Sequence, residues 1–160
     1  MAESRSLILA DPQATREQGR RLAATLQVLR PAQLIVYLEG DLGAGKTTLA
    51  RGFLEGLGHE GRVPSPTYTL VEPYEVSGYR VYHIDLYRVR DPRELDDLGL
   101  ADQLGSGAVA LIEWPDHGAG RLPPPDVRVR LDVVPAGRAL VYEGLTDLGH
   151  SVLTICGQAQ

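Results

Sequence analysis

Cysteine, lysine, tryptophan and methionine each occur only once in this chain of 160 residues. The single Cys156 excludes both an internal disulfide and a zinc site built from cysteines. The chain also lacks any apolar run of about 18 residues, the length that predicts a membrane-spanning helix. Its first apolar run, Leu7 to Ala10, is too short for a secretion signal. We therefore expect no membrane contact and a cytoplasmic location in a reducing environment.

Positive charge is scarce as well. The chain has 16 lysines and arginines against 21 acidic residues, a formal net charge of −5. A protein that binds nucleic acid unaided is usually basic. If RNA is involved, we expect a partner to supply most of the electrostatic attraction.

The only lysine, Lys46, completes the pattern Gly-x-x-x-x-Gly-Lys-Thr at residues 40–47, which is a P-loop. The apolar residues before it, 34–38, are β-branched, aromatic or leucine and predict a buried strand. Residues 48–57 after it have helical spacing and stop at Gly58, which predicts a helix. The motif therefore has the strand–loop–helix context that it requires.

A P-loop binds phosphate because its glycines let successive backbone N–H groups point inward at the phosphate oxygens. The following helix directs its positive end at the same anion. Lys46 then supplies a compact charge and Thr47 a hydroxyl for Mg²⁺. The other basic residues are arginines, so lysine is kept for the one place where a planar guanidinium would fit poorly.

Two further predicted strands end in acidic residues. Residues 79–85 end in Asp85, which either has a Walker-B-like or base role or is a solvated turn residue. Residues 109–115 predict a parallel strand beside the first and contain Glu113 at the carboxyl edge, where open α/β sheets bind ligands. Glu113 is a candidate Mg²⁺ ligand or water-positioning base, and Trp114 a core anchor or a wall of the site.

The remaining segments predict elements around this centre. Asp11-Pro12 predicts the start of a helix that runs to about Leu29. Residues 68–75 and 79–85 predict one β-hairpin, and residues 127–134 and 138–143 another. Asp91-Pro92 predicts a second capped helix through residue 98, so we reject the GTPase-like Asp-x-x-Gly at 96–99. No element is predicted for the tail, residues 146–160.

Three polar residues have open roles at this point. Thr67 follows two prolines in a stiff loop, which is either a nucleotide-sensing switch or a rigid connection. Thr15 lies in the first turn of the early helix, where a capping hydroxyl is the simplest role. His83 lacks a second nearby histidine, so we interpret it as a packed or hydrogen-bonded strand residue rather than a metal ligand.

These elements predict an α/β fold, a three-layer P-loop NTPase with a mixed parallel and antiparallel sheet, in one domain over residues 1–160. Taken together, the motifs resemble the TsaE (YjeE) family over about residues 8–145. The resemblance rests on GDLGAGKTTL, VPSPTYTLVEPY, VYHIDLYR, DPRELDDLGL and LIEWP, at 40–49, 63–74, 81–88, 91–100 and 111–115.

The resemblance implies a small bacterial ATPase that uses ATP and Mg²⁺ to support threonylcarbamoyl-adenosine formation in tRNA. It implies TsaB and TsaD as partners, with TsaD transferring the threonylcarbamoyl group and tRNA contacted through the complex. It places Mg²⁺ on Thr47 and Glu113, catalytic weight on Lys46, Thr67 and Asp85, and nucleotide contacts on Trp114, Arg138 and Thr15. The implied phosphate cradle comprises Gly40, Asp41, Leu42, Gly43, Ala44, Gly45, Lys46, Thr47 and Thr48.

The alternative reading is a stand-alone small-molecule kinase with the same P-loop. A kinase needs an acceptor pocket and usually an arginine-rich lid. The arginines at 80, 88, 90 and 93 surround a predicted strand end and a capped helix instead of an inserted lid. ATP turnover with candidate acceptors, and then with the partner proteins, distinguishes the two functions.

Overall fold

A computed structural model describes residues 3–105 and 107–158 of the chain. Its single sheet has seven strands in the order β1-β7-β6-β2-β5-β4-β3. In chain order the elements are β1 (Glu3–Leu9), α1 (Pro12–Leu29), β2 (Leu34–Glu39), α2 (Lys46–Gly56), β3 (Val71–Val76), β4 (Tyr79–Asp85), the 3₁₀ helix η1 (Pro92–Leu98), α3 (Leu100–Leu104), β5 (Val109–Glu113), η2 (Pro115–Gly118), β6 (Val127–Val134), β7 (Gly137–Gly144) and α4 (Asp147–Gln158).

The centre of the sheet is parallel and its edges are antiparallel. β2 pairs in parallel with β5 on one side and with β6 on the other, and β4 pairs in parallel with β5. β3, β7 and β1 add antiparallel pairs at the two edges. The continuous apolar runs of β2 and β5 suit this central position, because both faces of a parallel strand are covered. The mixed sheet predicted from the sequence is confirmed.

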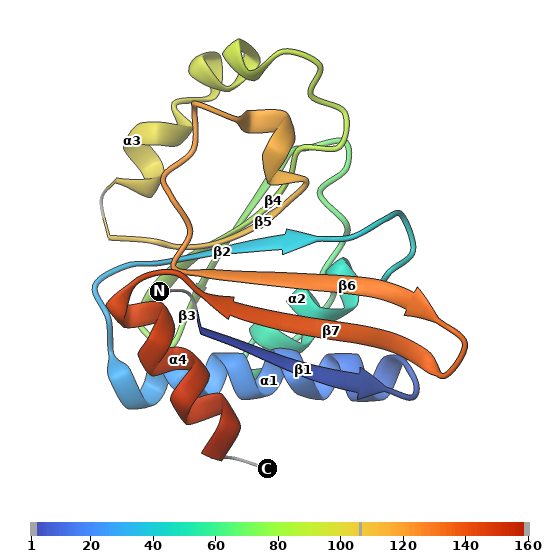
Figure 1. The fold of residues 1–160 in the computed structure, drawn as a ribbon. Helices are drawn as coiled ribbons and strands as arrows, with labels where there is room; N and C mark the ends of the chain where they lie inside the picture. Colours follow the sequence, from blue (N-terminus) through green and yellow to red (C-terminus); the bar gives the residue numbers. More distant parts are fainter. Residues whose placement is uncertain (1–2, 106, 159–160) are drawn as a thin grey trace.

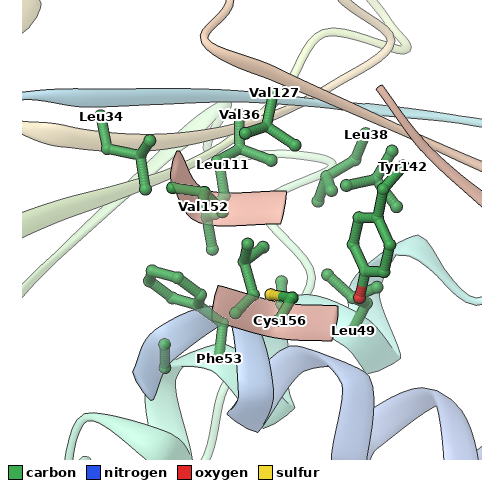
Figure 2. Close-up of a cluster of buried hydrophobic side chains, with 14 of the residues drawn as sticks. Leu34, Val36, Leu38, Leu49, Phe53, Leu111, Val127, Tyr142, Val152 and Cys156 are labelled. Carbon is green, nitrogen blue, oxygen red and sulfur yellow. The ribbon is translucent and has the colours of Figure 1, made fainter. Parts of the chain in front are cut away.

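Two hydrophobic clusters lie on opposite faces of the sheet, as a three-layer α/β fold requires. Figure 1 shows α1, α2 and α4 on one side of the sheet, and α3 with the 3₁₀ helices on the other. The side covered by α1, α2 and α4 holds the larger cluster, in which Phe53 of α2 and Val152 of α4 approach β2 residues such as Val36 (Figure 2). This cluster fixes α2, and with it the P-loop, against the centre of the sheet.

α1 and α2 approach closely because both carry glycine at their contact. A Cβ at Gly19 would overlap the carbonyl oxygen of Leu49, and a Cβ at Gly52 would overlap that of Arg16. Arg16 also makes a two-pronged ion pair with Glu55, at 2.7 and 2.8 Å. α1 begins as predicted, since the side chain of Asp11 accepts from the backbone N–H of Ala14.

The structure corrects several sequence predictions. The first hairpin strand begins at Val71 rather than at residue 68, because residues 66–69 form a turn that Leu70 closes with a hydrogen bond to the carbonyl of Pro66. The helix after the P-loop begins at Lys46, earlier than predicted. Residues 92–98 form a 3₁₀ helix, so the Asp-x-x-Gly match lies in helix, as argued from its cap.

The tail also forms structure that the sequence pattern did not predict. Residues 147–158 make α4, which buries Val152, Leu153 and Cys156 in the larger cluster. Gly149 and Gly157 weaken its helical pattern, and packing on the sheet compensates. No helix in the described ranges combines the length and apolar character needed to cross a membrane.

Candidate functional site

The P-loop connects β2 to α2 at the carboxyl edge of the parallel strands. Gly40 and Gly43 have positive φ angles, +146° and +78°. A Cβ at Gly40 would overlap the carbonyl oxygen of Leu131, so both space and conformation favour glycine there. A Cβ at Gly43 would meet nothing within 4 Å, so conformation alone favours glycine. The backbone is therefore curled as a phosphate cradle requires.

Lys46 folds back over this loop. Its Nζ donates to the carbonyl oxygens of Gly40 and Asp41, the latter at 3.2 Å, and lies 4.1 Å from the centre of the Trp114 ring. Burial lowers the pKa of Lys46, although nearby carboxylates, Glu113 first among them, act in the opposite direction. It makes no ion pair with any carboxylate in the described residues. Its charge is therefore available to a bound anion.

Glu113 and Asp85 lie side by side at the ends of β5 and β4, where they are register partners. Only 2% of Glu113 and 5% of Asp85 is exposed. The Thr47 hydroxyl donates to Glu113, 3.1 Å from Oε2 and 3.4 Å from Oε1. The two predicted magnesium ligands are thus in contact, although 66 residues separate them in the chain.

Asp85 is bound to the proline-rich loop. The Thr67 hydroxyl donates to Asp85 Oδ2 at 3.2 Å, and the Ser65 hydroxyl lies 2.8 Å from that of Thr67. The other carboxylate oxygen accepts from the backbone N–H of Tyr87 at 2.9 Å. Asp85 is therefore a buried, hydrogen-bonded group and not a solvated turn residue. Any movement of the proline-rich loop would change the hydrogen bond that Asp85 accepts from Thr67.

Trp114 is a wall of the site and also packs against the smaller hydrophobic cluster. It follows Glu113 with a left-handed backbone, φ +57°, which ends β5 and turns the chain. The ring contacts those of Tyr87 and His117, with centres 5.1 and 5.5 Å away. One face meets Lys46, so the ring lies between the P-loop and the segment after β4.

Arg138 and Thr15 lie on the opposite side of the P-loop. The Arg138 guanidinium donates to the carbonyl oxygens of Ala44 at 3.1 Å and Gly43 at 3.2 Å. Thr15 is almost fully buried, and its methyl would be 3.5 Å from a Cβ built at Gly45. The structure contradicts a capping role for Thr15, because Asp11 caps α1.

The predicted residues line two pockets. The first, about 220 Å³, we call the carboxylate pocket; it is lined by Leu42, Gly43, Ala44, Gly45, Lys46, Thr47, Thr48, Ser65, Thr67, Asp85, Glu113 and Trp114. The second, about 150 Å³, we call the Arg138 pocket; it is lined by Leu9, Ala10, Asp11, Pro12, Thr15, Gly43, Gly45, Thr48, Gly137 and Arg138. Gly40 and Asp41 line neither and join the site through their bonds to Lys46.

A larger hollow of about 480 Å³ lies beside η1 and α3 and contains none of the predicted site residues. The carboxylate pocket is smaller but contains the buried ammonium group, the two carboxylates and the hydroxyls. The chemistry of the lining, not volume, identifies the candidate site.

Comparison with known proteins supports one family. The model for "Threonylcarbamoyl adenosine biosynthesis protein TsaE" matches residues 9–139, most of the chain. This chain belongs to the TsaE family. The TsaE protein of Haemophilus influenzae is 46% identical over 137 residues, covering 85% of this chain and 87% of its own. The TsaE protein of Streptomyces coelicolor is 42% identical over 120 residues, 73% and 78% of the two chains.

A solved structure agrees with the fold of this TsaE-family chain. The crystal structure of YdiB from Bacillus subtilis superposes with a TM-score of 0.83 and 25% identity. The match covers 99% of this chain and 97% of that one, so it includes the antiparallel edge strands and the C-terminal α4.

Magnesium and a nucleotide fit the residues of this TsaE-family site. Mg²⁺ prefers oxygen ligands and usually takes one or two carboxylates together with substrate phosphates. Thr47 and Glu113 supply a hydroxyl and a carboxylate, and Lys46 supplies an unpaired charge for phosphate. Within the described part of the chain, no cluster of three His, Cys, Asp or Glu side chains offers a self-sufficient metal site.

Sequence reasoning missed the partner of His83. The prediction that His83 is a hydrogen-bonded strand residue is confirmed, but the bond is to Glu113 itself, at 2.7 Å. The signal was the spacing: His83 and Asp85 are two residues apart on a strand and so share a face. Only the register of β4 against β5 shows that Glu113 lies on that same face.

Proposed function

We propose that this chain is a Mg²⁺-dependent ATPase that supports threonylcarbamoyl-adenosine modification of tRNA together with TsaB and TsaD. The observation that carries the proposal is the carboxylate pocket, where Lys46, Thr47, Thr67, Asp85 and Glu113 converge on one P-loop. Family membership supports the modification pathway. This role places the protein in the cytoplasm.

Each residue then has a distinct task. The backbone N–H groups of residues 40–48 and the Lys46 ammonium bind the phosphates. Thr47 and Glu113 hold Mg²⁺, which supplies positive charge where negative charge develops in phosphoryl transfer. Asp85 and Thr67, linked at 3.2 Å, orient the attacking water, since each retains a free lone pair. Trp114 excludes solvent from one side of the lysine.

The Arg138 pocket accepts the nucleoside in this proposal. It adjoins the P-loop through shared residues such as Gly43 and Thr48, so one nucleotide can span both pockets. Arg138 fixes the loop through its carbonyl contacts, and buried Thr15 forms the floor.

The loop of Ser65 and Thr67 is our candidate switch. It is bound to the site by the Thr67–Asp85 bond and to α2 by the bond from Arg51 Nε to the carbonyl of Val63, at 3.2 Å. Beside it, Tyr68 is 80% exposed and lies under the Arg88 guanidinium, 4.1 Å from its ring centre. This exposed pair and Tyr87 form the proposed contact surface for TsaB and TsaD. Binding of tRNA is then indirect, in keeping with the net charge of −5.

The decisive experiment measures ATP hydrolysis by the purified chain with Mg²⁺ or with EDTA, alone and with TsaB and TsaD. We expect Mg²⁺-dependent release of phosphate that changes when both partners are present. Formation of ADP and a phosphorylated acceptor, without free phosphate and without any effect of the partners, would support the kinase instead.

The switch is tested by titrating the protein into TsaB–TsaD with ADP and with a non-hydrolysable ATP analogue. We expect tighter binding in the ATP state, and a smaller difference in Thr67→Ala with nucleotide affinity largely retained. Ser77→Ala is the control, because Ser77 lies in a turn distant from the loop and its hydroxyl donates to the carbonyl of Leu57. Equal affinity of the wild type in both states would rule out the switch.

A further inference from the structure

His83 is fully buried in β4, and its position is not explained by packing alone. Its Nε2 lies 2.7 Å from Oε2 of Glu113, the shortest polar contact that this carboxylate makes. Its other ring nitrogen, Nδ1, is buried without a hydrogen-bond partner among the described residues. An unsatisfied buried polar atom costs free energy, which an apolar side chain would avoid.

The unpartnered Nδ1 shows which nitrogen carries the proton. A proton on Nδ1 would leave a buried N–H with no acceptor, which is rarer than a buried acceptor with no donor. A proton on Nε2 is instead donated to Glu113, whose charged form accepts it. Glu113 Oε2 therefore accepts from His83 and from Thr47, while Oε1 has only the 3.4 Å contact with Thr47.

The strand register explains why His83 can act only through Glu113. The side chains of His83 and Asp85 lie on the same face of β4, because the two residues are two positions apart on a strand. Asp85 is the register partner of Glu113. His83 lies behind the two carboxylates and is absent from the lining of the carboxylate pocket. It is connected to the pocket through the Glu113 carboxylate, with which it forms a hydrogen bond.

The geometry points to His83 as a positioning residue: its Nε2–H fixes the Glu113 carboxylate in the orientation that binds magnesium. The inference rests on the proposed function, because it assigns Mg²⁺ to Glu113. Outer hydrogen bonds to metal ligands commonly matter in this way, and losing one costs roughly 10- to 100-fold in metal affinity or activity.

The test compares His83→Leu, which has no donor, with His83→Gln, whose amide can place an N–H near the position of Nε2. ADP affinity is measured by calorimetry in EDTA and across a Mg²⁺ titration, with thermal unfolding recorded in parallel. We expect His83→Leu to raise the Mg²⁺ concentration for half-maximal tightening about tenfold, with ADP affinity in EDTA unchanged. His83→Gln should restore most of the Mg²⁺ response.

If His83→Leu does not fold, His83→Asn takes its place, since its shorter amide reaches only the position of Nδ1. A second arm repeats the measurement in the Glu113→Ala background, where replacing His83 should have no further effect on Mg²⁺. A wild-type Mg²⁺ response in the donor-less variant, with only a lower unfolding temperature, would make His83 purely structural. An equal loss of the Mg²⁺ response in His83→Gln would lead to the same conclusion. An effect of replacing His83 that persists in the Glu113→Ala background would do so as well.

The wild type separates this inference from the proposed function. If ADP binds the wild type without any Mg²⁺ effect, the magnesium assignment itself fails and His83 loses its role with it. If Mg²⁺ tightens binding in the wild type and in His83→Leu equally, the assignment stands and only the positioning role is overturned.

Discussion

The carboxylate pocket and the Arg138 pocket adjoin the same loop but are built differently. The carboxylate pocket gathers three buried charged side chains, Lys46, Asp85 and Glu113. The Arg138 pocket is lined mostly by small residues, three of them glycines, and the arginine donates to the carbonyls of residues 43, 44 and 137. Thr15 contributes a buried hydroxyl and methyl group.

The difference predicts how each pocket recognises its part of a ligand. Buried charges need partners, and Lys46, which makes no ion pair with a carboxylate in the described residues, specifies an anion. A pocket of backbone and small side chains selects mainly by shape, and single side chains matter less there. Substitutions should therefore have large effects on the carboxylate side and small effects on the Arg138 side.

The largest effect is expected for Lys46→Ala. Removing a charge-assisted contact to phosphate costs about 1.5–3 kcal/mol, roughly 10- to 150-fold in nucleotide affinity, and turnover should fall to background. Lys46→Arg should not rescue it, because the planar guanidinium does not fit the loop. Calorimetry and phosphate release measure the two effects. Wild-type-like binding by Lys46→Ala would remove the phosphate assignment, whereas wild-type-like binding by Lys46→Arg would contradict only the argument from the shape of the guanidinium.

The second-largest effect is expected for Glu113→Ala. Loss of the carboxylate should lower Mg²⁺-dependent hydrolysis on the order of 100-fold while nucleotide binding in EDTA stays near that of the wild type. Glu39→Ala is the matched control, because Glu39 also ends a strand but pairs with Arg128 outside the pocket. Normal turnover with a lower unfolding temperature would make Glu113 structural.

A smaller effect is expected for Arg138→Ala. Its bonds to the carbonyls of Ala44 and Gly43 are worth about 0.5–1.5 kcal/mol each, so nucleotide affinity should fall a few-fold to tenfold. Turnover at saturating ATP should stay within about twofold, because the carboxylate pocket is intact. Arg130→Ala, which removes only an exposed pair with Asp132, is the control. A large loss of saturated turnover would contradict the division between the pockets.

The smallest effect is expected for Thr15→Val, which keeps the shape of the side chain and removes the hydroxyl. We expect a change of about 1 kcal/mol or less in nucleotide binding, measured by calorimetry with ADP. Thr25→Val is the control, since that buried hydroxyl bonds the carbonyl of Leu22 on the same helix, outside both pockets. An effect as large as that of Lys46→Ala would show that Thr15 contacts the nucleotide directly.

The sequence predicted the positions of the residues that line the carboxylate pocket, because each has a local signal. The P-loop is contiguous, and Asp85 and Glu113 each stand at the end of a predicted strand. The central parallel strands were predictable for the same reason, since β2 and β5 are apolar on both faces. The turn at residues 66–69 and α4 were not, because a local hydrogen bond and packing on the sheet decided them.

The sequence by itself determined that this chain has a P-loop motif, a parallel centre and acidic residues at two strand ends, because hydrophobic period and glycine spacing are local properties. Only the tertiary structure decided which side chains meet. His83 and Glu113 are joined by the register of β4 on β5. Arg138 reaches the P-loop because β7 pairs with β6, which in turn pairs with β2. Strand pairing depends on contacts between residues far apart in the sequence, so no single stretch of sequence predicts it.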